Sequence, residues 1–174
     1  MDKVVFLDRD GVINVEKNYL YKIEDFEFIK GVFESLQYLQ NLGYKLVIIT
    51  NQSGIGRGYY TKEQYDKLTL WIKKEFTRNN INITEIFCCP HGPEEGCDCR
   101  KPKIGMIQQA SAILDIDYEN SWIVGDKSSD IQTGINANIC NTIQVKTGHS
   151  FDEKSSKALY IINSIEQIPT IIKS

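Results

Sequence analysis

Short apolar runs alternate with segments of helical periodicity along the 174-residue chain. Each run is brief and almost continuously apolar, which is typical of strands that are buried on both faces. The predicted strands are residues 3–7, 45–50, 85–89, 122–125 and 142–145. Between them, apolar residues recur every three or four positions, which predicts helices. The predicted helices are residues 31–42, 61–78, 104–114 and 128–137, and the C-terminal part is predicted to add a short strand at 159–162 and a helix at 164–172.

Two of these helices carry recognisable end signals. Thr61 and Gln64 have the spacing of a capping box, which opens a helix. Gly43 directly follows Leu42, the last apolar residue of another helix, where a glycine favours termination. Strands that alternate with such helices predict βαβ units, and therefore an α/β fold built on a mostly parallel sheet.

The ends of the predicted strands carry residues suited to chemistry. Asp8, Thr50, Cys89 and Asp126 each lie at or just past the end of a strand. Ligands of parallel sheets bind beyond the carboxyl ends of the strands. We therefore expect these four residues to gather at one edge of the sheet.

Composition limits the class of protein but does not identify it. The chain is 41% hydrophobic and 25% charged, with a net charge of −3, so nothing indicates a nucleic-acid or membrane-surface partner. The start, MDKVVFLDRD, is too charged for a signal peptide, and no apolar stretch approaches the ~20 residues of a membrane span. We expect one domain, residues 1–174, in the cytoplasm. There the five cysteines would be reduced, which favours metal binding or catalysis over disulfides.

The segment FLDRDGVIN, residues 6–14, places two aspartates at a strand end. A carboxylate such as Asp8 can attack phosphorus and form an aspartyl-phosphate. A second one, Asp10, can protonate the leaving oxygen and later activate water. The pair also suits Mg²⁺, a cation that prefers oxygen ligands. The alternative is a solvated acidic turn, which the preceding apolar strand and the following Gly11 disfavour.

Two further motifs are less specific when each is taken alone. In IITNQSGIGRGYYT, residues 48–61, Thr50 offers a hydroxyl, and the glycines fit either a phosphate cradle or a flexible connector. Tyr59 and Tyr60 fit a substrate mouth or a cover over this loop equally well. In WIVGDKSSDIQTG, residues 122–134, Asp126 fits a Mg²⁺ site shared with Asp8 or a helix N-cap.

The loop CCPHGPEEGCDCRKP, residues 88–102, has the strongest metal signature. Three thiols and one imidazole lie within eleven residues and suit tetrahedral zinc. The four ligands predicted for Zn²⁺ are Cys89, His91, Cys97 and Cys99. Such a set leaves no open coordination position, which is typical of a structural site. Arg100 and Lys101 follow the last ligand directly and can bind phosphate, although a solvated basic surface is the ordinary reading of such a pair.

Together these motifs resemble the haloacid dehalogenase-like phosphohydrolases. The matching elements, in the same order along the chain, are DRDG at 8–11, TN at 50–51, RKP at 100–102 and GDKSSD at 125–130. More narrowly, the cysteine loop and its neighbours resemble the heptose 1,7-bisphosphate phosphatase family, over nearly the whole chain to about residue 150. The resemblance implies a Rossmann-like three-layer sandwich with strand order 5-4-1-2-3, a zinc-binding loop and no cap domain.

The resemblance also implies a role for each matching residue. Asp8 would be the nucleophile and Asp10 the general acid and base, while Thr50 and Lys101 would stabilise the transferring phosphoryl group. Mg²⁺ would be held by Asp8, Asp126 and the main-chain carbonyl of Asp10, with Asp130 outside that shell. The implied substrate-binding residues are Arg100, Asn51, Gln52, Ser53, Lys127, Glu16 and Tyr19. His149 is isolated in the sequence and is assigned no role.

The activity that the resemblance implies is a Mg²⁺-dependent release of phosphate from carbon 7 of D-glycero-D-manno-heptose 1,7-bisphosphate. The expected partner is this small sugar phosphate, with no nucleic acid or membrane involved, and the expected oligomeric state is a monomer. A histidinol-phosphate phosphatase is the alternative within the enzymes, because its members share the same elements, including a zinc loop. A non-catalytic, zinc-stabilised binding module is the alternative outside them, but it would not need the three strand-end aspartates.

Overall fold

The computed structural model describes residues 1–174 and is organised around a six-stranded sheet in which every pair of neighbouring strands is parallel. The strands are β1 (Val4–Leu7), β2 (Lys45–Asn51), β3 (Ile83–Cys89), β4 (Trp122–Gly125), β5 (Asn141–Val145) and β6 (Tyr160–Ile162). Their order is β3-β2-β1-β4-β5-β6. The predicted order 5-4-1-2-3 is confirmed, and β6 extends the sheet beyond β5.

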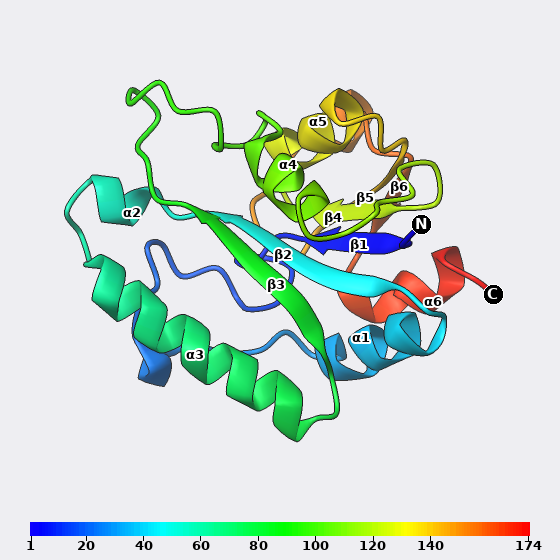
Figure 1. The fold of residues 1–174 in the computed structure, drawn as a ribbon, viewed down its shortest axis with the longest axis horizontal. Helices are drawn as coiled ribbons and strands as arrows, with labels where there is room; N and C mark the ends of the chain where they lie inside the picture. Colours follow the sequence, from blue (N-terminus) through cyan, green and yellow to red (C-terminus); the bar gives the residue numbers. More distant parts are fainter.

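Helices cover both faces of this sheet (Figure 1). One face carries α1 (Val32–Asn41), α3 (Lys62–Arg78) and α6 (Ile168–Ile171), and the other carries α4 (Gly105–Ser111) and α5 (Ser128–Asn136). A separate hydrophobic cluster fills each interface, as alternating strand side chains point to opposite faces. The predicted three-layer α/β sandwich is therefore confirmed.

The end signals of the helices act as predicted. The Thr61 hydroxyl accepts a hydrogen bond from the Gln64 main-chain N–H at 3.2 Å, and the Gln64 side chain accepts one from the Thr61 N–H at 2.8 Å. Gly43 has a φ of +84°, a conformation that other residues adopt only with strain, and it ends α1. None of the helices is both long enough and apolar enough to span a membrane.

Several segments differ from the prediction. β3 begins at Ile83 instead of residue 85, α4 ends at Ser111 instead of residue 114, and two short 3-10 helices, Ile23–Asp25 and Glu153–Ser155, lie where none was predicted. The glycine-rich residues after β2 include a one-turn helix, α2 (Ser53–Gly56), which the sequence pattern did not predict. The helix predicted at 164–172 is divided into a 3-10 helix, Ile165–Gln167, and the short α6. Pro169 lies in the first turn of α6, where its missing N–H costs nothing, and this favours a new helix start over a continuous helix.

Candidate active site

Carboxylates from three segments meet beyond the ends of β1 and β4. Carboxylate oxygens of Asp8, Asp126 and Asp130 all lie within 4.8 Å of one another. Lys101 Nζ lies 2.9 Å from Asp8 Oδ1 and 2.6 Å from Asp130 Oδ1, and it donates a hydrogen bond to the Ile49 carbonyl at 2.8 Å. The Lys101 side chain is only 2% exposed. The strand ends therefore gather as expected, and a buried ammonium group joins them.

The cluster holds more negative charge than its one lysine balances. Burial raises the pKa of Asp8 well above its ordinary value, and the neighbouring carboxylate of Asp130 raises it further against the opposing effect of Lys101. Burial alone would lower the pKa of Lys101, but Asp130 and Asp8 together raise it above its usual range. Lys101 is therefore held as a cation, and the site still favours a further positive charge.

The carboxylate oxygens that remain free fit a divalent cation. The Arg9 main-chain N–H and Lys101 both contact Oδ1 of Asp8, so its Oδ2 is left free. Asp126 Oδ1 is buried and has no hydrogen-bond partner, which is costly unless a ligand satisfies it. A Cβ on Gly148 would lie 2.1 Å from Asp126 Oδ2, so only glycine allows this close approach. The donor set fits Mg²⁺, which takes oxygen ligands.

Asp130 takes a structural part in the same cluster. Its Oδ2 accepts hydrogen bonds from the main-chain N–H groups of Asp126 and Lys127, at 3.1 and 3.0 Å. It thereby caps the start of α5 from the third helical position, a place where an acidic side chain is favourable. The alternative in which Asp126 caps the helix is wrong, because Asp130 supplies the capping oxygen and Asp126 points into the cluster.

Asp10 is surrounded by hydrogen-bond donors. Arg9 Nη2 and Asn14 Nδ2 each lie 3.0 Å from its Oδ1, and Arg9 Nε and Gln52 Nε2 lie 3.2 and 2.9 Å from its Oδ2. Burial alone would raise the pKa of Asp10, but the Arg9 guanidinium and these hydrogen bonds lower it overall. Asp10 is therefore held as a carboxylate, the form that acts as a base.

The cysteine loop brings together the four residues predicted for zinc. Cys89 Sγ lies 3.6 Å from both His91 Nδ1 and Cys97 Sγ, and His91 Nδ1 lies 3.2 Å from Cys99 Sγ. Tetrahedral zinc with bonds of ~2.0–2.3 Å separates its ligands by roughly 3.3–3.8 Å; the two spacings of 3.6 Å lie in this range and the spacing of 3.2 Å lies just below it. The structure confirms that the four side chains converge.

The same loop is tied to the end of β2. The Asn51 amide accepts a hydrogen bond from the Lys101 N–H at 3.0 Å and donates one to the Lys101 carbonyl at 3.3 Å. Arg100 Nη1 donates to the His91 carbonyl at 3.4 Å. In Figure 1 the loop and α2 lie beside the ends of β2 and β3, and the Gly56 N–H donates to the Pro90 carbonyl at 2.9 Å. Asn51, expected to bind substrate, thus also fixes the main chain at Lys101.

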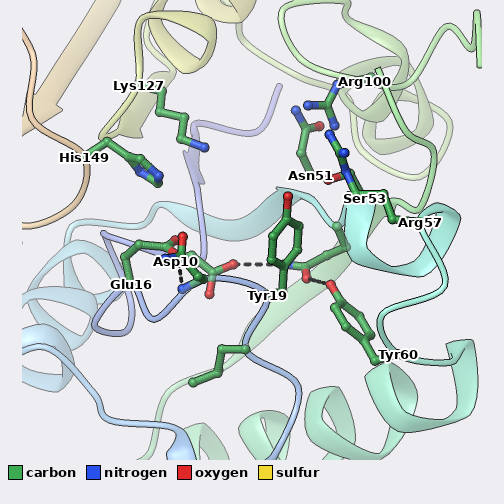
Figure 2. A pocket seen from close by; sticks show the side chains of 13 residues that line it. Asp10, Glu16, Tyr19, Asn51, Ser53, Arg57, Tyr60, Arg100, Lys127 and His149 are labelled. Atoms are coloured by element: carbon green, nitrogen blue, oxygen red, sulfur yellow. Dashed lines mark hydrogen bonds between the residues drawn. The ribbon is translucent and has the colours of Figure 1, made fainter. Parts of the chain in front are cut away.

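A polar pocket opens in front of Asp10 (Figure 2). All the residues expected to bind substrate line it: Glu16, Tyr19, Asn51, Gln52, Ser53, Arg100 and Lys127. Besides these residues and Asp10, the pocket wall contains Asn18, Leu20, Arg57, Tyr60 and His149. Tyr60 is buried with its hydroxyl directed to Gln52, whereas Tyr59 is exposed and packs edge-on against Tyr19. The two tyrosines therefore differ: Tyr60 lies in the pocket wall, and Tyr59 is an exposed neighbour of Tyr19.

His149 is the clearest residue that sequence reasoning missed. Its main-chain N–H donates to Asp126 Oδ2 at 2.8 Å, and its Nδ1 lies 2.7 Å from the same oxygen. His149 follows β5 by a few residues, so the rule that selected Asp8 and Asp126 would have selected it as well. Its contact leaves Asp126 Oδ1 as the free oxygen of that carboxylate.

A parallel sheet with an aspartate pair after β1, a lysine bridge and a further aspartate after β4 defines the class of aspartate-based phosphoryl-transfer sites. The profile of the family described as polynucleotide kinase 3 phosphatase matches residues 3–166. The chain belongs to this family of haloacid dehalogenase-like phosphatases, together with the curated heptose-1,7-bisphosphate 7-phosphatases that resemble it over nearly its whole length.

Two curated relatives and one solved structure illustrate the similarity. The chain is 44% identical over 180 residues to D-glycero-beta-D-manno-heptose-1,7-bisphosphate 7-phosphatase of Pasteurella multocida, which covers 99% of this chain and 98% of the relative. It is 52% identical over 143 residues to the alpha-anomer 7-phosphatase of Campylobacter jejuni, which covers 82% of each. The D,D-heptose 1,7-bisphosphate phosphatase of B. bronchiseptica, complexed with magnesium and phosphate, superposes with a TM-score of 0.83 at 25% identity and covers 97% of this chain and 96% of that one.

Proposed function

We propose that this protein is a Mg²⁺-dependent phosphatase that releases the phosphate at carbon 7 of D-glycero-D-manno-heptose 1,7-bisphosphate and leaves heptose 1-phosphate. The curated relatives named above carry this activity in their names. The observation that carries the proposal is the buried cluster in which Lys101 holds one oxygen of Asp8 and leaves the other free.

The first step is attack on phosphorus by the free Oδ2 of Asp8. The bond between phosphorus and the sugar oxygen breaks, and that oxygen takes a proton from Asp10, which leaves an aspartyl-phosphate on Asp8. The three N–H bonds of Lys101 already have partners in the protein, so its positive charge rather than a new hydrogen bond would offset the developing charge on the phosphoryl oxygens. The Thr50 hydroxyl, which is fully buried, would donate toward the same oxygens.

The second step returns the enzyme to its starting state. Asp10, now ionised, takes a proton from water, whose oxygen bonds to phosphorus as the bond to Asp8 breaks. The donors around Asp10 favour the carboxylate needed here. For the first step Asp10 must carry a proton. The negative charge of a bound phosphate would raise the pKa of Asp10 against the lowering effect of Arg9, and so favour the protonated form.

Two metal ions complete the proposal. Mg²⁺ held by Asp8, Asp126 and the main-chain carbonyl of Asp10 would offset charge on the transferring phosphoryl group. Zn²⁺ held by the four residues of the cysteine loop would be structural, since no ligand position stays open for substrate. The free oxygens in the first cluster and the tetrahedral spacing in the second support these assignments.

The rest of the substrate fits the polar pocket. Arg100 and Lys127 reach it from opposite sides (Figure 2), and both are suited to phosphate. Glu16 and Tyr19 face the same space and are placed to contact sugar hydroxyls. We propose that the protein works as one domain, residues 1–174, in which these short loops shape the pocket in place of a cap.

The test is a phosphate-release assay with Mg²⁺ and three substrates: the alpha and beta anomers of heptose 1,7-bisphosphate, and histidinol phosphate. Relatives of both anomeric types resemble the chain, so both anomers belong in the panel. We expect rapid phosphate release from at least one heptose anomer and slow release from histidinol phosphate. Asp8→Asn should abolish release from all three substrates. Faster release from histidinol phosphate would replace the proposed substrate, and no release from any of them would point to a binding module.

A further inference from the structure

Tyr60 lies at the start of a buried chain of hydrogen bonds that ends on the proposed acid–base residue. Its hydroxyl donates to Gln52 Oε1 at 2.5 Å. Gln52 Nε2 in turn donates to Thr50 Oγ1 at 2.8 Å and to Asp10 Oδ2 at 2.9 Å. Figure 2 shows the Tyr60 hydroxyl directed at the amide that reaches Asp10. Tyr60 and Gln52 are 4% and 3% exposed, so solvent does not compete for these bonds.

The chemistry of the partners fixes the orientation of the Gln52 amide. A carboxylate only accepts hydrogen bonds, so the group that faces Asp10 must be the amide nitrogen. The amide oxygen then faces Tyr60, which must donate. Burial raises the pKa of Tyr60, so its hydroxyl keeps this proton at neutral pH. Both N–H bonds of Gln52 are used within the protein, which leaves no donor for the substrate contact expected from the sequence.

The fold holds the Tyr60 ring firmly in this place. The ring stacks on Tyr21 with a centroid distance of 5.3 Å and an interplanar angle of 16°. A Cβ on Gly54 would lie 2.2 Å from a carbon of the Tyr60 ring, so glycine at that position makes room for it. The glycine-rich segment therefore allows an aromatic residue to pack directly against α2.

Gln52 differs from the other side chains that hold Asp10. Arg9 and Asn14 belong to the same turn as Asp10, so they orient it only relative to its own segment. Gln52 follows β2 and bonds Asp10 and Thr50 at once. Its amide therefore sets the position of the proton-transfer group relative to the phosphoryl site.

We propose that Tyr60 is a positioning residue whose hydroxyl orients the Gln52 amide, which in turn holds the Asp10 carboxylate against Thr50 for proton transfer. The proposal rests on the phosphatase function above, but it concerns one step of it. Proton donation by Asp10 matters when the leaving group is a sugar alkoxide, which is strongly basic. It matters little for p-nitrophenyl phosphate, whose phenolate leaves without a proton.

The experiment compares kcat/KM for heptose bisphosphate and p-nitrophenyl phosphate in Tyr60→Phe. We expect kcat/KM for the sugar to fall about tenfold, part of the ~100- to 10,000-fold that general acid–base catalysis supplies. The value for p-nitrophenyl phosphate should change less than about twofold. Tyr21→Phe is the matched control, because it removes a hydroxyl from the ring stacked on Tyr60 and should leave both values unchanged.

Three results would overturn the proposal. An equal loss with both substrates would show a general structural defect, and no loss with the sugar would show that the hydroxyl does not position Asp10. If Tyr60 acts through Gln52, adding Tyr60→Phe to Gln52→Met should not lower kcat/KM further, because the effects of residues in one hydrogen-bond network are not additive. An additional loss of kcat/KM would show that Tyr60 acts by another route.

A measurement without turnover separates this inference from the proposed function. The side-chain NH₂ protons of Gln52 should exchange slowly with solvent in the wild type and faster in Tyr60→Phe, as read by NMR. Equal exchange would overturn the orientation argument whatever the activity. Failure of the wild type to release phosphate from the sugar would instead overturn the proposed substrate, while the exchange result would still decide the role of Tyr60.

Discussion

Replacing Lys101 with methionine tests the electrostatic core of the site most directly. Methionine matches the lysine side chain as far as Cε, but the ammonium group is lost from between Asp8 and Asp130. Two buried carboxylates are then left without their common partner, together with the Ile49 carbonyl. Removing one member of a buried ion pair costs about 3–5 kcal/mol, because the remaining charge stays desolvated.

This cost corresponds to a measurable change in thermal stability. For a chain of this length, each 1 kcal/mol shifts Tm by about 2–4 °C, so Lys101→Met should melt roughly 6–20 °C below the wild type. The assay is thermal unfolding at neutral pH without added Mg²⁺, so that no added cation replaces the lost charge. In acid the difference should shrink, because protonation of Asp8, whose pKa is already raised, removes the stranded charge.

Lys103→Met is the matched control on the same loop. Lys103 is half-exposed, and its nearest carboxylate, Asp98, lies 3.8 Å away, so its loss should cost less than about 1 kcal/mol. Adding Asp130→Asn to Lys101→Met should recover part of the stability by neutralising one stranded carboxylate. Equal melting temperatures for Lys101→Met and Lys103→Met would refute the view that Lys101 balances the cluster.

Three further predictions follow from the same geometry. Asp8→Asn should stabilise the metal-free protein. The pKa of Asp8 is higher in the folded than in the unfolded state, so the stability of the wild type falls as pH rises between these two values. Denaturant titrations should show the stability advantage of the variant growing over that range. Cys97→Ser should lower the bound zinc, measured by elemental analysis, and lower phosphate release about 10- to 100-fold. Cys140→Ser, at an exposed thiol outside the cluster, should change neither quantity. Normal turnover without zinc would contradict this prediction. His149→Ala should weaken Mg²⁺ binding to Asp126 about tenfold in a calorimetric titration, and unchanged affinity would show that His149 does not orient this carboxylate.

The main features of the fold and site could be predicted because they depend on local patterns. Apolar runs identify the strands, helical spacing identifies the helices, and the rule for strand ends places Asp8 and Asp126 at one edge of the sheet. The spacing of the cysteines and the histidine predicted in the same way that these four side chains converge. These signals are contained in short segments, so no contact between distant loops was needed to interpret them.

Contacts between loops could not be predicted in this way. The sequence shows that Asn51 and Gln52 are polar and near the site. It does not show that the Asn51 amide bonds the main chain of Lys101. Nor does it show that the Gln52 amide bonds Asp10 and Tyr60. The glycines after β2 were compatible with a cradle or a connector, whereas two of them allow close packing against Tyr60 and the cysteine loop. The role of each glycine depends on which segment of the protein packs against it, and the composition of the loop does not contain that information.

The cysteine loop and β2 hold Lys101 from independent directions. Zinc bound by the four residues of the cysteine loop would fix the chain as far as Cys99, while Asn51 bonds both main-chain groups of Lys101, and the Ile49 carbonyl accepts from its ammonium group. Loss of that zinc would therefore remove one of two constraints on the lysine and leave the other in place. For this reason a zinc-free variant should turn over more slowly than the wild type but faster than Lys101→Met, in which the charge itself is absent.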